Sequence, residues 1–328
     1  MVKDLPAPHR SHARGGTLQG GRVTAARSPW AVHRPGGRDV VLMGIAVVGV
    51  SFSGPLTALV TTSFLAIAFW RTAAGAALLV PVLLGRERAT LTGLRPRQLG
   101  SSVVAGLFLA AHFAAWLPSL SMTTVAASTA LVTTTPIWTA LAARVSGVRL
   151  PAQVWWGLAL AVVGVALIAG VDVTVSLEAL AGDGLALLGA VCAGGYMLAG
   201  ARARTRLATS AYSVVCYSTC AVALALAALV TGTALAGFSA RDWWLIAAIT
   251  VCAQLFGHTL LNLVLSSVGP TVVGLAVLLE VPGALLVALV LLGQTPPLLA
   301  LPGMVAVIAG VALVVRAGRP PTPVEPVT

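Results

Sequence analysis

The sequence is short of charged residues, and of acidic residues above all. Only 9% of its 328 residues are charged, with 9 Asp and Glu against 20 Lys and Arg. A soluble domain is about a quarter charged, whereas 58% of the residues here are hydrophobic and the mean hydropathy is +0.97. This shortage of charge excludes a water-soluble globular domain and predicts an integral membrane protein.

Cysteines and catalytic motifs are also scarce. The four cysteines all lie inside apolar runs, so no disulfide framework is predicted. The chain has no Walker-type phosphate loop and no G-x-S-x-G motif, and every Asp lies in a tail or a loop. We therefore expect no enzyme and no cofactor, with an intramembrane enzyme or a receptor scaffold as much weaker alternatives.

The net charge of +11 raises the question of nucleic-acid binding. Seven of the basic residues lie in the N-terminal tail, and most of the others lie in short loops, which argues against a nucleic-acid surface. The sequence predicts a basic, disordered cytoplasmic tail over residues 1–38 and a Pro-rich cytoplasmic tail over 317–328.

Ten apolar runs of membrane-spanning length lie between these tails, since about 20 residues of helix cross the hydrocarbon core of a bilayer. The predicted helices are 40–60, 63–84, 99–119, 123–143, 152–171, 182–201, 209–231, 243–265, 270–292 and 299–316. Alternate connections carry the arginines, which predicts cytoplasmic termini in a multi-pass protein of the plasma (inner) membrane. The predicted fold class is thus an all-α integral membrane protein.

The two halves of the chain repeat each other. An ungapped shift of 146 residues places His112 on His258 and Pro136 on Pro282. The shift crosses five spans, an odd number, so the halves lie in opposite orientations across the membrane. We predict two inverted five-helix repeats, over residues 39–171 and 182–316, an arrangement common among transporters.

Three segments carry a family resemblance: AIAFWRTAAGAALLVPVLL (66–84), GLFLAAHFAAWLPSLSMTTVAASTALVTTTPIWTAL (106–141) and LLEVPGALLVALVLLGQ (278–294). In these segments, in their order and in their duplication, the chain resembles the EamA-like ten-helix branch of the drug/metabolite transporter superfamily. The resemblance implies a transporter, usually an exporter of amino acids, metabolites or toxic compounds, with a cavity between the halves. One departure is that Val281, Pro282 and Gly283 follow Glu280, where family members often have Pro directly after the glutamate.

Two ionisable residues lie deep in predicted spans, Arg71 and Glu280. Inserting either costs about 2.5–3.5 kcal/mol, so each is expected to face a cavity or a partner. For both, the alternatives are a structural ion pair and a functional role. Because burial disfavours the charged form of a carboxyl, Glu280 is the candidate for proton exchange.

Other polar and aromatic residues extend the predicted site. His112 and His258 are repeat mates, with interhelical hydrogen bonding and cavity lining as the alternatives. Spacings of four residues predict one polar stripe on a helix from Gln254, His258 and Asn262. The aromatic residues expected at the cavity are Trp70, Trp116 and Tyr196.

Two prolines inside predicted spans, Pro136 and Pro282, are expected to break their helices. The carbonyls that they free, at Val132 and Leu278, could bind a solute or take a bond from a nearby threonine hydroxyl. The mixture of Arg71, Glu280 and aromatic residues suits zwitterionic or amphipathic solutes.

These patterns predict a secondary transporter that exports small metabolites, amino acids or amphipathic drugs by alternating access, with proton coupling as an option. An importer or uniporter of the same fold is the alternative. The expected partners are a small-molecule solute, the lipid bilayer and, with coupling, protons. A homodimer is one option for the oligomeric state.

Overall fold

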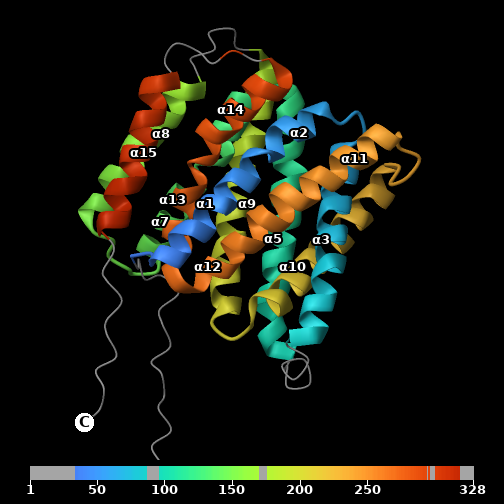
Figure 1. The fold of residues 1–328 in the computed structure, drawn as a ribbon, viewed down its shortest axis with the longest axis horizontal. Helices are drawn as coiled ribbons and strands as arrows, with labels where there is room; N and C mark the ends of the chain where they lie inside the picture. The colour runs from blue at the N-terminus through green and yellow to red at the C-terminus, as the bar shows by residue number, and fades with distance from the viewer. Residues whose placement is uncertain (1–33, 87–95, 170–175, 294, 296–299, 318–328) are drawn as a thin grey trace, which may run out of the picture.

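The computed structural model describes residues 34–86, 96–169, 176–293, 295 and 300–317. The two predicted tails therefore lie outside the described residues, apart from 34–38 and 317. Every regular element in the described ranges is a helix. The first described helix begins, and the last one ends, at the same end of the bundle (Figure 1). An even number of spans requires this arrangement.

The prediction of a ten-helix membrane protein is confirmed. Nine helices in the described ranges are long and apolar enough to cross a membrane, and the shorter apolar helix Ala152–Ile168 is the fifth of the series. The elements of the first half are α1 (Gly37–Ser51), α2 (Ser53–Leu59), α3 (Phe64–Arg86), α5 (Pro96–Met122), α6 (Val125–Val132), α7 (Thr135–Val145) and α8 (Ala152–Ala169).

The second half follows the same plan. Its elements are α9 (Leu177–Arg204), α10 (Thr209–Thr231), α11 (Ala240–Ile249), the π-helix η1 (Thr250–Thr259), α12 (Leu260–Val268), α13 (Pro270–Val277), α14 (Glu280–Leu292) and α15 (Ala300–Ala317). Large apolar side chains cover the outside of the bundle, and Leu229 and Val290 are 78% and 81% exposed. Hydrocarbon is the solvent that suits such a surface.

The helices α8 and α15, which are repeat mates, pack against each other at one edge of the bundle (Figure 1). A Cβ atom on Gly157 would lie 2.7 Å from the carbonyl oxygen of Gly310, and one on Gly164 would lie 2.6 Å from that of Gly303. The numbering rises along α8 while it falls along α15, so the two helices are antiparallel. Repeat mates that run in opposite directions are what an inverted repeat requires.

Three spans are interrupted near a proline. The fourth span breaks between α6 and α7, just before Pro136, and the ninth breaks between α13 and α14, just before Pro282. Proline lacks the amide hydrogen and its ring crowds the carbonyl four residues earlier, so a helix seldom continues through it unchanged. The freed carbonyl of Val132 accepts a hydrogen bond from the Thr135 hydroxyl at 2.8 Å. The first span breaks at Phe52, before Pro55.

The eighth span contains the π-helix η1, which the sequence did not predict. The hydrogen bonds of a π-helix join residues five apart, so it takes more residues per turn than an α-helix. Residues four apart therefore no longer lie on one line, and the predicted stripe of Gln254, His258 and Asn262 is divided. Gln254 points to Arg71 at 3.1 Å, whereas the other two line the central pocket.

The glycine contacts generate the first prediction. Gly164→Ala should lower stability by about 1–3 kcal/mol, since its Cβ would overlap the backbone of α15. The matched control is Gly184→Ala on α9, whose Cβ would meet no atom within 4 Å. That variant should match or exceed the parent chain in melting temperature, because alanine favours a helix by roughly 0.5–1 kcal/mol. Equal melting temperatures for the two variants would contradict close packing of α8 on α15.

Candidate functional site

A pocket lies between the two repeats, with an empty volume of about 650 Å³ that includes its open part. Both halves supply its walls: α1, α2, α5, α6 and α7 from the first, and α9, η1, α12, α13 and α14 from the second. The two broken helices α6/α7 and α13/α14 pack against each other, with Gly274 next to Pro136, and both line the pocket. Discontinuous helices line many transporter sites.

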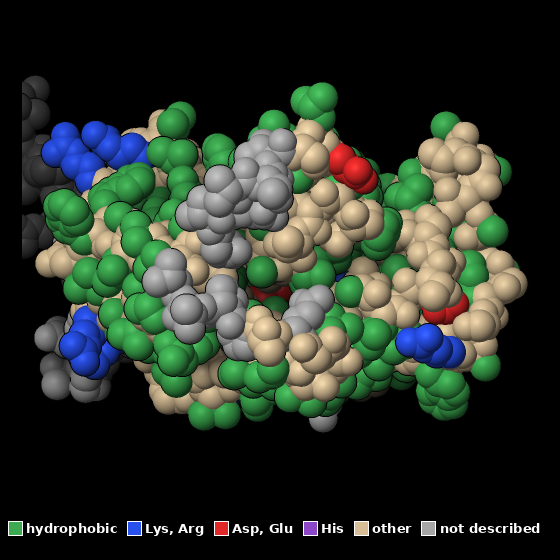
Figure 2. All heavy atoms as spheres, turned by 90° about the horizontal axis from the view of Figure 1, so that it is seen from above, with side chains coloured by type: hydrophobic (Ala, Val, Ile, Leu, Met, Phe, Trp, Pro, Cys, Tyr) green, Lys and Arg blue, Asp and Glu red, His purple; other side chains and the backbone are tan. Residues whose placement is uncertain are grey.

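The end of the bundle opposite the chain termini carries a hollow near the centre of its face (Figure 2). Acidic side-chain atoms are visible at its floor. Among the residues that line the pocket, Glu280 is the acidic one.

The pocket brings together six of the eight predicted binding or coupling residues. They are His112, Trp116, Tyr196, His258, Asn262 and Glu280. Arg71 and Gln254 do not line it. Trp70 does not line it either, because its indole nitrogen donates to the Leu235 carbonyl at 2.7 Å and its ring packs on Trp243. The sequence predicted that Arg71 would place a cationic side chain in the cavity, but Arg71 does not line the pocket.

Arg71 is fully buried behind one wall of the pocket. Its Nε donates to Gln254 at 3.1 Å, and its Nη1 donates to Ser53 at 3.0 Å. The guanidinium also lies over the Phe113 ring, 4.4 Å from the centroid. These contacts join α2, α3, α5 and η1. Glu280 is not among these partners, so these contacts do not support the structural ion pair that was one alternative for both residues.

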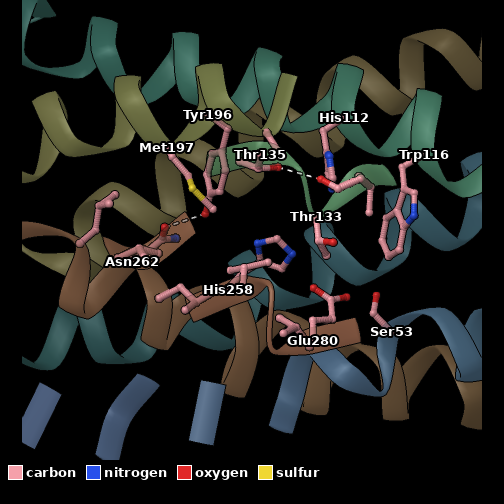
Figure 3. A pocket seen from close by; sticks show the side chains of 17 residues that line it. Ser53, His112, Trp116, Thr133, Thr135, Tyr196, Met197, His258, Asn262 and Glu280 are labelled. Carbon is pink, nitrogen blue, oxygen red and sulfur yellow. Dashed lines mark hydrogen bonds between the residues drawn. The ribbon is translucent and has the colours of Figure 1, made fainter. Parts of the chain in front are cut away.

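Glu280 is the first residue of α14, and its side chain is 7% exposed. The positive end of the helix dipole lies there and favours a negative charge. Figure 3 shows its carboxyl group directed into the pocket, near Ser53 and Thr133. No hydrogen bond from this carboxyl group is present in the described part of the chain. A carboxyl group that lines a pocket without a hydrogen-bonded protein partner can bind another group there.

The two histidines occupy different positions in the pocket. His112 Nδ1 lies 2.9 Å from the Gly189 carbonyl, which can only accept, so this nitrogen carries the hydrogen. In the neutral ring, Nε2 is then an acceptor. His258 lies between the Tyr196–Asn262 side and the Glu280–Ser53 side (Figure 3). Its ring contacts Phe113 edge-on, with centroids 5.6 Å apart.

A hydrogen-bonded cluster lies on the other side of the pocket. The Tyr196 hydroxyl donates to Asn262 at 2.6 Å, and the Asn262 amide donates to Tyr217 at 3.2 Å. Arg204, at the end of α9, donates from Nε to the Asn262 carbonyl at 3.0 Å. The cluster joins α9, α10 and α12 on the side of the chain termini.

The pocket also contains polar residues that the sequence did not single out for it. They are Ser53, Thr133 and Thr135. Each is next to a helix break, at Phe52 for Ser53 and before Pro136 for the threonines. A proline-containing polar run inside an apolar span is the signal that could have found them. Met197, the remaining labelled residue in Figure 3, gives no comparable signal.

The fold and pocket define a class: a ten-helix membrane protein with a central pocket between two inverted repeats. The family model "EamA-like transporter family" matches residues 38–170 and 180–316. The chain belongs to the EamA-like transporter family. One similar solved structure, titled "Crystal structure of protein", has a TM-score of 0.68 and 19% identity, and covers 86% of this chain and 98% of that one. At this identity the likeness shows the fold alone. A comparison with curated proteins found no match.

Arg71 generates the second prediction. A lysine cannot bond Gln254 and Ser53 in the two-nitrogen geometry of a guanidinium, so Arg71→Lys should lose stability while it keeps the charge. Hydrogen bonds to charged groups contribute about 1.5–3 kcal/mol each, and we expect a loss of that order in thermal unfolding. Arg241→Lys, at an exposed position, is the control and should leave the melting temperature unchanged. An unchanged melting temperature in Arg71→Lys would contradict the structural role.

Proposed function

We propose that this chain is a secondary transporter that exports small solutes across the plasma membrane by alternating access, driven by proton exchange at Glu280. The observation that carries the proposal is the pocket itself, since it is lined by both inverted repeats and contains an unpartnered carboxyl group. Two near-equivalent halves can rock around such a site and open it to each side in turn.

The two ends of the pocket support alternating access. The hollow lies at the end opposite the termini (Figure 2). The Tyr196–Asn262–Tyr217 cluster and Arg204 tie the helices together at the other end. If the termini are cytoplasmic, this conformation is the outward-open one. Breaking the cluster is then part of the return to the inward-open conformation.

The surroundings of Glu280 support proton exchange. The ionisable groups on the elements around it are Arg71 on α3, His112 on α5 and His258 on η1. Arg71 donates to Gln254 and Ser53, and His112 to Gly189, so neither donates a hydrogen bond to the carboxyl group, although the charge of Arg71 acts on it through space. A buried carboxylate without a hydrogen-bonded cation is disfavoured, so it takes up either a proton or a positively charged group.

Topology gives the third prediction. Reporter fusions at Thr328 should signal from the cytoplasm, and fusions in the 172–182 loop should signal from the opposite side, because arginines concentrate on the cytoplasmic side. A cytoplasmic signal from that loop would contradict both the topology and the outward-open assignment. Removing residues 1–33 is the control, since the remaining loop arginines should maintain the same orientation.

The fourth prediction concerns coupling. Glu280→Gln mimics the protonated acid, so it should fold normally, retain solute exchange and lose accumulation driven by a pH gradient. The measurement is uptake and efflux of a solute panel in proteoliposomes, with and without the gradient. Glu178→Gln, an exposed glutamate at the start of α9, is the control and should transport normally. Accumulation by Glu280→Gln equal to that of the parent chain would exclude Glu280 as the coupling residue.

A further inference from the structure

The contact between Arg71 and Ser53 leaves one hydrogen without a partner. Arg71 is 0% exposed behind the wall of the pocket, and its Nη1 donates to the Ser53 hydroxyl oxygen at 3.0 Å. A guanidinium group has no acceptor, so Ser53 can only accept in this contact and its own hydrogen points elsewhere. Within the described ranges, no protein acceptor receives that hydrogen. The Ser53 hydroxyl is therefore a free donor.

Other hydroxyls close to the pocket do not have this freedom. Those of Thr133 and Thr135 donate back to carbonyls of their own span, at 2.9 and 2.8 Å. The hydroxyl of Ser51, two residues before Ser53, does the same at 2.7 Å. Such hydroxyls keep only their acceptor side for a solute. Ser53 has the opposite arrangement, because its acceptor side is used by Arg71 and its donor side is free.

Ser53 also has the position that a binding residue needs. It is the first residue of α2, directly after the break at Phe52, and it lines the pocket. Figure 3 shows its oxygen directed toward the space that the Glu280 carboxyl group faces. The indole nitrogen of Trp116 has no partner in the described ranges either, but it is enclosed in the pocket wall. The Ser53 hydroxyl is thus the donor that faces the pocket at this end.

Arg71 strengthens this donor from behind. Arginine keeps its charge in proteins, and a hydroxyl that accepts from a charged donor is polarised, which makes it a stronger donor in its turn. The Nη2 nitrogen of Arg71 has no partner among the described residues, so hydrogen bonds compensate its charge only in part. An oxygen with free lone pairs is stabilised at this position, whereas an ammonium group has no lone pair to offer.

From these contacts we infer that Ser53 selects solutes with an acceptor oxygen: a carbonyl or carboxylate oxygen of the solute receives the Ser53 hydrogen, and Arg71 positions and polarises the hydroxyl. The inference rests on the proposed transport function and deepens it, because it assigns the group by which the solute is held. The apolar part of the solute then packs on Leu261, Leu265 and Val273 of the lining. Arg71 acts on the solute although it does not line the pocket.

The test is equilibrium binding to the purified full chain in lipid nanodiscs, measured by calorimetry with empty nanodiscs subtracted. Three probes share a phenyl body: 4-phenyl-2-butanone has a neutral carbonyl, 3-phenylpropanoate a carboxylate, and 3-phenylpropylamine an ammonium group without an acceptor. Ser53→Ala should weaken binding of the ketone at least about threefold and of the carboxylate at least about tenfold. Binding of the amine should change by less than about twofold. A loss confined to one oxygen probe identifies which oxygen the pocket takes.

Three further variants separate recognition from folding. Ser51→Ala is the matched control, since its hydroxyl bonds its own span, and it should leave all three affinities unchanged. Ser53→Thr keeps the hydroxyl and should retain binding of the oxygen probes. Ser53→Cys keeps the shape but has only a weak donor, so it provides the test if Ser53→Ala does not fold. The infrared carbonyl frequency of ¹³C-labelled ketone should be lower in the parent chain than in Ser53→Cys, because a donated hydrogen bond weakens the carbonyl bond.

Three results would overturn the inference: an equal loss for all three probes in Ser53→Ala, unchanged affinity for both oxygen probes, or no binding of either oxygen probe at millimolar concentration. The first result would assign Ser53 to the structure of the pocket alone. Because binding needs no gradient, a chain that binds the probes as expected but fails to accumulate solute contradicts the transport proposal alone.

Discussion

The constraint on which this structure depends is that the bilayer core offers no hydrogen-bonding partner. Each buried polar group must therefore find its partner inside the protein. The threonine hydroxyls at the break before Pro136 turn back onto carbonyls of their own chain, and Arg71 is held by Gln254 and Ser53. These polar residues thus stabilise the fold through hydrogen bonds. A polar residue can bind a solute only through a donor or acceptor that has no hydrogen-bond partner within the protein.

Glu280 is the main residue left in that position. Its carboxyl group lies at the start of α14, where the helix dipole favours its charge, and it faces the pocket. Arg71 has the opposite arrangement, with full burial and partners on neighbouring helices. Two residues that look alike in the sequence, as single charges in apolar spans, therefore have different tasks. Arg71 joins helices, and Glu280 gives the pocket its chemical character.

The two repeats share one framework, but some equivalent positions carry different residues, which makes the two halves chemically asymmetric. The 146-residue shift places Arg71 on Tyr217, and both bond to the eighth span, at Gln254 and Asn262 respectively. Both repeat mates thus bond the eighth span, with different chemistry. Glu280, in contrast, falls on Thr134, whose hydroxyl donates to the Leu131 carbonyl. An acid in one half only gives the pocket of a symmetric scaffold a single acidic position among its lining residues.

The sequence by itself determined that the chain lies in a membrane, the number of its spans, its duplication and the helix breaks at Pro136 and Pro282, because hydrophobic length and proline act locally along the chain. It did not reveal the break at Phe52. Only the tertiary structure decided which polar residues share the pocket. The π-helix turned Gln254 away from His258, and packing placed Ser53 between Arg71 and the pocket. Spacing along a regular α-helix could not reveal either arrangement, because both depend on how residues from different spans satisfy one another's hydrogen bonds.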